Sequence, residues 1–256
     1  MGAPRSSSSK RTSTIAIGAA FVVAVGVGLT VRHLFAARSK RPASARATSA
    51  SAAARNERIL HVPHMPGSIT LDGDTDDPGW TSQPGPGRTR DFEFENGAPG
   101  RPFSEVRLVW GDGFLYLSLY ASDENIQTRT HEPDGPLWLD DAFRVVFSQD
   151  DVEYAIEVSP EAIVTDSIRH GGGKWDYSWS SGVHASKEWD GTLNNEKDMD
   201  EEWVIEMAVP FESIGLEGKP GESIGFSVHR CDTPKNDPRI CTSWGEGDQK
   251  GRLVLD

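Results

Sequence analysis

The sequence predicts an all-β fold, a two-sheet antiparallel β-sandwich of the jelly-roll or immunoglobulin-like kind, preceded by one transmembrane helix. From residue 59 onward, short runs of alternating apolar and polar residues are separated by turn residues, and no stretch keeps a helical period. The helix is predicted by Thr14–Val31, an uncharged and almost wholly apolar run of 18 residues. As a helix it would be about 27 Å long, close to the roughly 30 Å of a bilayer core.

These patterns divide the chain into a basic Ser-rich N-terminus (1–13), the transmembrane segment (14–31), an Ala-, Ser- and Arg-rich linker (32–58) and the β domain (59–256). A cleaved signal peptide is the alternative, but Arg32 and His33 follow the run where a small-x-small cleavage site would lie. Three basic residues precede the run and five follow it up to Arg46. The positive-inside rule alone therefore favours a cytoplasmic β domain.

The charge is divided unevenly between the tail and the β domain. Residues 1–58 hold ten of the 26 basic and one of the 39 acidic residues, which leaves 16 basic and 38 acidic residues, a formal charge of −22, for the other 198 residues. Such a field repels phosphate backbones, so no nucleic-acid partner is expected, and it favours association with cations. The basic linker is expected near anionic headgroups or a wall polymer.

The strands are predicted from their apolar faces. Val106, Leu108 and Trp110 share one face, and the turn at 111–113 joins them to Phe114–Tyr120, which is apolar on both faces and therefore central. Apolar residues alternate with other residues in three more strands, 143–147, 154–158 and 203–209. Further strands are expected near 163–169, 182–188, 223–230 and 251–255, which gives about ten in one domain.

Two adjacent aspartates precede the strand at 143–147. If the strand begins in register at Asp141, that residue shares the core side with Phe143, while Asp140 faces outward. Neighbouring side chains on a strand diverge, whereas the two carboxylates of a glycosidase converge on one bond. An enzyme is therefore not expected, and a hidden glycosidase would need two other carboxylates facing one cleft.

The order of landmarks along the chain resembles the family 9 carbohydrate-binding modules. The ordered set carries the resemblance from about Ile69 to Leu255: LDGDTDDPGW (71–80), VRLVW (106–110), LYLSLY (115–120), WLDDAFRVVF (138–147), EWVIEMAVPF (202–211), PGESIGF (220–226) and a late Ser-Trp at 243–244. The resemblance implies a β-sandwich, often with structural calcium, that grips sugar ends between two tryptophans. Such modules are commonly attached to glycan-degrading enzymes.

The resemblance also implies site residues. Trp138 matches the family's tryptophan before the Asp-containing strand, and Trp244 matches the late one, so these two are the expected pair around a sugar. A flat indole suits the axial C–H groups of a pyranose ring. Asp140 and Arg169 are expected to bind sugar hydroxyls. Arg144 stands where the family usually has an acidic residue, which is a departure within the expected sugar contacts.

The other tryptophans have different expected roles. Trp80, Trp110 and Trp203 lie in or beside landmark strands and are expected in the core. Trp175 alternates with Tyr177 and Trp179 after a run of three glycines, so the three rings would share a face of an extended segment. They form either a loop-borne stacking surface for a sugar or a cover over a sheet edge.

Asp72, Asp74 and Asp76 have the alternating spacing of a calcium loop. The segment is not an EF-hand, because Asp77 and Gln83 stand where that loop needs glycine and a bidentate glutamate. A structural calcium ion is expected here or elsewhere in the acidic domain. A turn rich in Asp and Gly also forms without metal, so that alternative stays open.

Cys231 and Cys241 are the two cysteines of the chain and flank a polar loop. A single pair ten residues apart across a turn favours a disulfide that closes the loop, with two reduced thiols as the alternative. A disulfide favours an exported domain. This argument opposes the cytoplasmic orientation and places the domain in the periplasm or at the cell surface.

Together these patterns predict a membrane-anchored, extracytoplasmic and non-catalytic module that binds a polysaccharide or oligosaccharide, in support of polysaccharide catabolism and with a glycoside hydrolase as a partner. One alternative is a structural envelope β-sandwich without a sugar ligand, for which Arg144 is the main evidence. The other is a haem-binding electron-transfer subunit of related fold, with Met65, Met199 or Met207 as an iron ligand.

Overall fold

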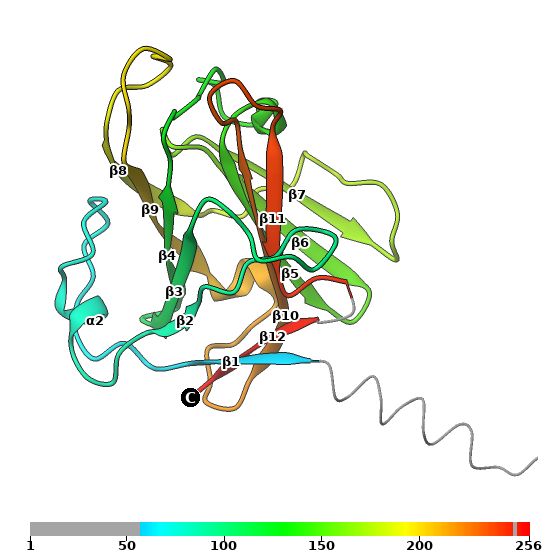
Figure 1. The fold of residues 1–256 in the computed structure, drawn as a ribbon. Helices are drawn as coiled ribbons and strands as arrows, with labels where there is room; N and C mark the ends of the chain where they lie inside the picture. The colour runs from blue at the N-terminus through cyan, green and yellow to red at the C-terminus, as the bar shows by residue number, and fades with distance from the viewer. Residues whose placement is uncertain (1–56, 248–249) are drawn as a thin grey trace, which may run out of the picture. The chain divides into compact units, whose positions relative to one another are not determined.

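The computed structural model describes residues 57–247 and 250–256, and the predicted transmembrane run lies outside the described residues. In the described part of the chain, no helix is long and apolar enough to cross a membrane. That part forms twelve strands in two sheets, with three short helical turns (Figure 1). The β-sandwich predicted from the alternating pattern is therefore confirmed.

The larger sheet has seven strands in the order β1-β12-β10-β5-β6-β7, with β11 paired to β10. Every pair in it is antiparallel except β1 and β12, which run parallel at one edge (Figure 1). The bounds are β1 Arg58–Val62, β5 Ala142–Gln149, β6 Val152–Val158, β7 Val164–His170, β10 Ser223–Asp232, β11 Ile240–Trp244 and β12 Gly251–Leu255.

The smaller sheet has five antiparallel strands in the order β2-β3-β4-β9-β8. Its central strand is β4, as the apolar residues on both of its faces predict. The bounds are β2 Gly87–Thr89, β3 Ser104–Gly111, β4 Phe114–Ser122, β8 His184–Asp190 and β9 Glu202–Pro210, and the helical turns are α2 Pro78–Thr81, η1 Leu137–Leu139 and η2 Phe211–Ile214.

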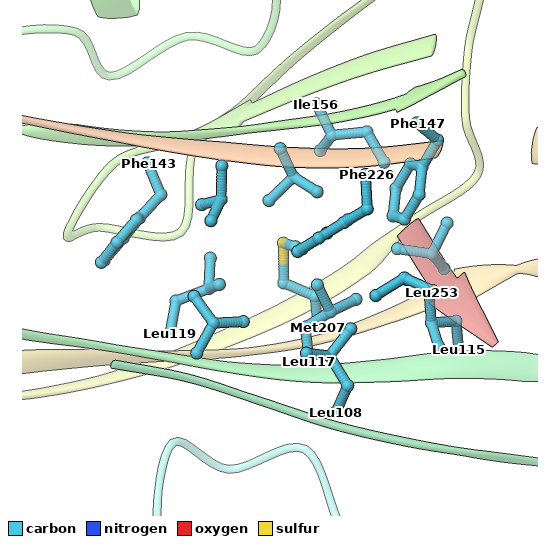
Figure 2. Packing of buried hydrophobic residues seen from close by; sticks show 14 of the residues in the cluster. Leu108, Leu115, Leu117, Leu119, Phe143, Phe147, Ile156, Met207, Phe226 and Leu253 are labelled. Atoms are coloured by element: carbon cyan, nitrogen blue, oxygen red, sulfur yellow. The ribbon is translucent and has the colours of Figure 1, made fainter. Parts of the chain in front are cut away.

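The core lies between the two sheets, where alternate residues of each strand face the opposite sheet. Figure 2 shows Phe143, Phe147 and Phe226 of the seven-stranded sheet packed towards Leu117 and Met207 of the five-stranded sheet. All five side chains are at most 2% exposed. At about 25 cal/mol per Å² of apolar surface, this burial is the main stabilising term of the domain.

The tryptophans predicted to be structural are buried. Trp80, Trp110 and Trp203 are 2%, 6% and 0% exposed, which confirms that prediction. Trp203 packs edge-on against Phe143 between the sheets. Trp80 lies on α2, against the other face of the five-stranded sheet, and its Nε1 donates to Glu206 Oε1 at 2.7 Å.

Two strands were not predicted, and both lie at sheet edges. Strand β2 has three residues, too few for an alternating pattern, and β1 alternates between half-buried and exposed positions before the buried Val62. Both segments are strands because they form backbone hydrogen bonds with a neighbouring strand, β1 with β12 and β2 with β3, and their sequence pattern does not predict this. The disulfide prediction is confirmed: Cys231 and Cys241 are joined, and they face each other directly in the β10–β11 register.

Candidate functional site

The candidate site is the face of the seven-stranded sheet that is turned away from the core, called here the outer face. Phe143, Val145 and Phe147 of β5 point into the core, so the residues between them point outward. The register then aligns outward residues across neighbouring strands. One row is His229, Arg144, Glu157 and Thr165, the next is Ser227, Val146, Ala155 and Ser167, and the third is Gly225, Ser148, Glu153 and Arg169.

Trp175 lies over this face. The segment after β7 folds back, and its Asp176 forms a backbone bridge with Ile168 of β7. The guanidinium carbons of Arg144 and Arg169 are 4.6 and 4.4 Å from the centre of the Trp175 ring. These distances are within cation–π range, so two rows of the sheet hold the ring in place. Three residues predicted for the sugar site, Trp175, Arg144 and Arg169, are thus brought together.

Each arginine is also paired with a glutamate of β6. Arg144 forms an ion pair with Glu157, and Arg169 Nη2 donates to Glu153 Oε1 at 2.9 Å. The hydrogen bond from Arg169 lowers the pKa of Glu153. Glu157, directly opposite Arg144 in the register, supplies a carboxylate on the same face.

The two glutamates were not predicted as site residues. Glu153 and Glu157 alternate with Tyr154 and Ile156 in the sequence, which does place them outward. The strand register was needed to pair them with the arginines. The polar groups on the outer face can accept and donate hydrogen bonds beside an aromatic ring, which is the arrangement that sugar-binding sites use.

Two hollows open on the outer face, on either side of the turn Gly245–Gly247. The first has a volume of about 730 Å³ and is lined by Glu93, Glu95, Asn96, His229 and Ser243 together with the turn. The second has a volume of about 560 Å³ and is lined by Ser148, Glu153, Ser227 and Arg252 together with the same turn. Both volumes lie within the range of about 300 to 1,000 Å³ typical of small-molecule sites.

The turn between the hollows carries one side chain beyond Cβ, that of Glu246. Its Oε1 lies 2.7 Å from His229 Nε2, and this contact lowers the pKa of Glu246. Gly245 has a φ of +78°, and a Cβ there would lie 2.6 Å from the carbonyl oxygen of Phe226. Only glycine therefore lets the turn lie this close to β10.

The structure contradicts the predicted pairing of Trp138 with Trp244. Trp244 is 6% exposed and packs against Phe226 in the core, so neither face of its ring is open to a ligand. Alternation along β11 causes this burial, because Trp244 shares the inward side with Thr242. Trp138 lies on η1 and is 56% exposed, so its role as a contact residue stays a prediction.

Asp140 is buried, contrary to the prediction that it faces outward. It is the residue that caps the C-terminal end of η1, and it is 0% exposed. The loop that contains Thr130 covers it, and its Oδ2 accepts the backbone N–H of Thr130 at a distance of 2.8 Å. A hydroxyl contact from this carboxylate is therefore not available. Asp141 does lie on the core side, as predicted: its two oxygens accept the backbone N–H groups of Gln127 and Thr233 at 2.6 and 2.7 Å.

Asp123, Asp141 and Asp232 form a buried acid cluster, with oxygens of the three residues within 4.8 Å of one another. It is the only such convergence among the described residues. The donor set does not fit a calcium ion, because Arg230 Nη2 already lies 2.6 Å from Asp123 and 2.9 Å from Asp232. Trp203 Nε1 donates to the same oxygen of Asp123 at 2.9 Å. A guanidinium therefore supplies the positive charge within this cluster.

The loop predicted to hold calcium is built around Glu206 of β9. Glu206 Oε2 accepts the N–H groups of Asp72 and Gly73 at 3.1 and 2.8 Å, while its Oε1 accepts Trp80 Nε1. These bonds explain why an Asp- and Gly-rich motif precedes that tryptophan. Asp72, Asp74 and Asp76 are exposed and do not converge, so calcium at this loop stays a prediction.

The methionines that were considered as haem ligands differ in their exposure to solvent. Met207 is 0% exposed in the core, whereas Met199 is 67% exposed. Met65 packs against Gly111, at the turn between β3 and β4. Neither of the two hollows on the outer face is lined by a methionine.

No protein-family profile matches the chain, and no curated protein matches it. Solved structures do. A candidate carbohydrate-binding protein from Bacteroides uniformis has a TM-score of 0.62 and 15% identity, with 78% of this chain and 99% of that chain covered. The fold is that of the family 9 carbohydrate-binding modules. Two structures of a family 9 module from Caldicellulosiruptor kristjanssonii establish this.

The module in complex with cellotriose has a TM-score of 0.51 and 15% identity over 78% of this chain and 94% of its own. The module in complex with glucose has a TM-score of 0.53 and 15% identity over 78% of this chain and 96% of its own. At this identity the likeness concerns the fold. The resemblance inferred from the ordered landmarks is thereby confirmed at the level of the fold.

Proposed function

We propose that this domain is a non-catalytic carbohydrate-binding module that binds glycan on its outer face, with Trp175 as the stacking platform. The observation that carries the proposal is the Trp175 ring held over the sheet by Arg144 and Arg169, beside polar hollows. An indole removes the apolar face of a sugar from water, while neighbouring polar groups bind its hydroxyls. The solved family 9 complexes with cellotriose and glucose support the ligand class.

The charges on this face favour a neutral glycan. Arg144 and Arg169 are each paired with a glutamate, so neither guanidinium is left to attract an anionic sugar. Each arginine and its glutamate hold each other in a fixed geometry. The guanidinium still has N–H donors, and the carboxylate still has acceptor positions, that can bind sugar hydroxyls. Asp140 and Asp141 are 0% exposed and accept backbone N–H groups of one loop, at Thr130 and Gln127, so neither carboxylate reaches the outer face, which supports binding without hydrolysis.

Replacing Trp175 by alanine tests the proposal. The full-length protein is first applied to a glycan array, and its best hit is titrated calorimetrically. We expect Trp175→Ala to weaken binding by roughly 1 to 3 kcal/mol, the scale of one desolvated aromatic contact. Trp189→Ala is the matched control, because Trp189 lies on β8 of the other sheet.

Thermal melts of both variants confirm that the domain remains folded. Unchanged binding by Trp175→Ala contradicts the platform. If the wild-type protein retains no glycan on the array, the proposed function itself is wrong. That result favours a structural envelope β-sandwich that has no sugar ligand.

We also propose that Thr14–Val31 anchors the protein in the membrane and that the β domain lies outside the cytoplasm. The apolar run, which Arg32 and His33 follow where a cleavage site would lie, and the Cys231–Cys241 disulfide support this placement. In that compartment, a module that holds polysaccharide near the membrane would assist a glycoside hydrolase in polysaccharide catabolism.

A further inference from the structure

The two hollows and Trp175 lie along one line across the strands. Glu153 lines the second hollow and pairs with Arg169, whose guanidinium stacks on Trp175. The turn Gly245–Gly247 lines both hollows. Trp175, the second hollow, the turn and the first hollow therefore follow one another across the outer face.

This line extends across most of the seven-stranded sheet. It begins over β7, crosses β6, β5, β10 and β11, and ends at Glu93, whose backbone bridges to Ser243 of β11. Five inter-strand steps of about 4.8 Å give a length of about 24 Å. That length is several times the size of one pyranose ring, so the line is longer than a terminal sugar needs.

The divider between the hollows is small. Gly245 and Gly247 carry no side chain, Gly245 lies directly against β10, and the Glu246 side chain is tied to His229. A chain that lies across this turn meets a low ridge and one carboxylate. The ridge separates two positions on the face without closing either.

Among the described residues, no indole is exposed at the turn to enclose the end of a sugar chain. Trp244, immediately before the turn, is buried in the core. Because the described residues offer no open indole face at this turn, end-on capture between two aromatic faces is not available there. Affinity must then come from contacts made in succession along the chain.

We propose that the outer face binds an internal run of several sugar units, with one part of the chain on Trp175 and another in the first hollow, and does not select a chain end. This inference rests on the proposed glycan-binding function. It specifies the ligand as a polymer segment recognised along its length.

Chain length and end chemistry test the inference. Full-length protein in a detergent without a sugar headgroup is titrated with the dimer and hexamer of the cello-, xylo-, manno- and chito-oligosaccharide series, and with each hexamer reduced at its end by borohydride. We expect the hexamer of the bound series to bind at least tenfold tighter than its dimer, and reduction to change the hexamer affinity less than twofold. Equal affinity of dimer and hexamer, or loss of binding on reduction, overturns the inference.

A blocking variant adds a test at the far hollow. Glu95 lines the first hollow, so Glu95→Trp should lower hexamer affinity at least fivefold and leave dimer affinity unchanged. Glu196→Trp is the control, because Glu196 is also exposed and lies in the β8–β9 loop, away from the outer face. Unchanged hexamer affinity in Glu95→Trp removes the first hollow from the site and overturns the inference.

The two possible failures are distinguishable. Absence of binding to every hexamer and to the glycan array overturns the proposed function, and the inference with it. Glycan binding that is lost when the chain end is reduced, or that is as tight for the dimer as for the hexamer, overturns the inference and leaves the proposed function in place.

Discussion

At the scale of single residues, Arg230 supplies the positive charge of the buried acid cluster of Asp123, Asp141 and Asp232. Its guanidinium lies between Asp123 and Asp232 and is 2% exposed. A buried carboxylate is costly unless a positive charge or hydrogen bonds compensate it. This compensating charge is covalently part of β10, so it comes to the cluster as the chain folds.

Removal of this charge should be strongly destabilising. We expect Arg230→Met to lower the free energy of unfolding by about 3 to 5 kcal/mol, because two buried carboxylates lose their partner while the apolar volume is kept. Urea unfolding measures the change. Arg252→Met is the control: its side chain is 40% exposed and pairs with Glu57 at the surface, so it should change stability little. Equal small effects of the two substitutions would contradict the role of Arg230.

Asp141 should make stability depend on pH. Burial, followed by the negative charge of Asp123, raises its pKa from 3.8 to about 7, although Arg230 acts in the opposite direction. Burial also raises the pKa of Asp232. Between about pH 4 and 7 the folded domain therefore holds a proton that the unfolded chain has released. The free energy of unfolding should fall as pH rises across this window and level off above it.

Urea unfolding at about pH 5 and pH 8 measures this loss. We expect Asp141→Asn to lose less stability between the two values than the wild type, because asparagine does not titrate. The two proteins are compared by the change in unfolding free energy between the two pH values. The absolute stability of the variant is not compared, because asparagine also loses an acceptor for one of two backbone N–H groups at every pH. Parallel losses in both proteins would show that other groups titrate in this window.

At the scale of elements, alternation predicted the strands and core faces, but not the partners of the outward residues. The tryptophans of β3 and β9 were placed in the core correctly, since landmark strands have clear apolar faces, whereas Trp80 of α2 is buried on the other face of the five-stranded sheet. Trp244 was misplaced because the family resemblance put it in the sugar site, whereas in β11 it lies on the inward side with Thr242. Asp140 was misplaced because the covering loop at Thr130 comes from outside the strand.

The cross-strand pairs on the outer face could not be read from the chain. Arg144 and Glu157 are 13 residues apart, and only the β5–β6 register puts them opposite each other. Likewise, Glu206 supports the Asp72 loop from 134 residues away. Strand register and contacts between distant loops depend on how the whole chain packs, so the pattern of residues within one short segment does not predict them.

The β10–β11 hairpin should depend on its disulfide. We expect the double variant Cys231→Ser/Cys241→Ser to lose about 2 to 3 kcal/mol of unfolding free energy, because the bond restricts the unfolded chain over a short loop. Thermal melts measure the loss, and counting thiols in native protein under denaturing, non-reducing conditions should find none that react. Two reactive thiols would contradict both the bond and the export argument.

At the scale of the whole molecule, charge divides the chain into a basic tail and an acidic domain. The 198 residues from 59 onward carry a formal charge of −22, while the outer face holds its arginines in neutral pairs. The acidity includes Glu93, Glu95 and Glu246 of the first hollow, which lie beside these neutral pairs on the outer face. It keeps the domain soluble and repels anionic surfaces, whereas the basic linker is attracted to them.

The protein should behave as an integral membrane protein whose β domain lies outside the cytoplasm. We expect the full-length protein to stay in the membrane pellet through alkaline carbonate washing, because Thr14–Val31 is uncharged and long enough to span a bilayer core. Protease added to intact cells should cut the β domain only after the outer barrier is opened. A mature N-terminus beyond residue 40 would rule out the anchor in favour of a cleaved signal peptide. Protection of the β domain until the inner membrane is breached would restore the cytoplasmic orientation that the flanking charges favour.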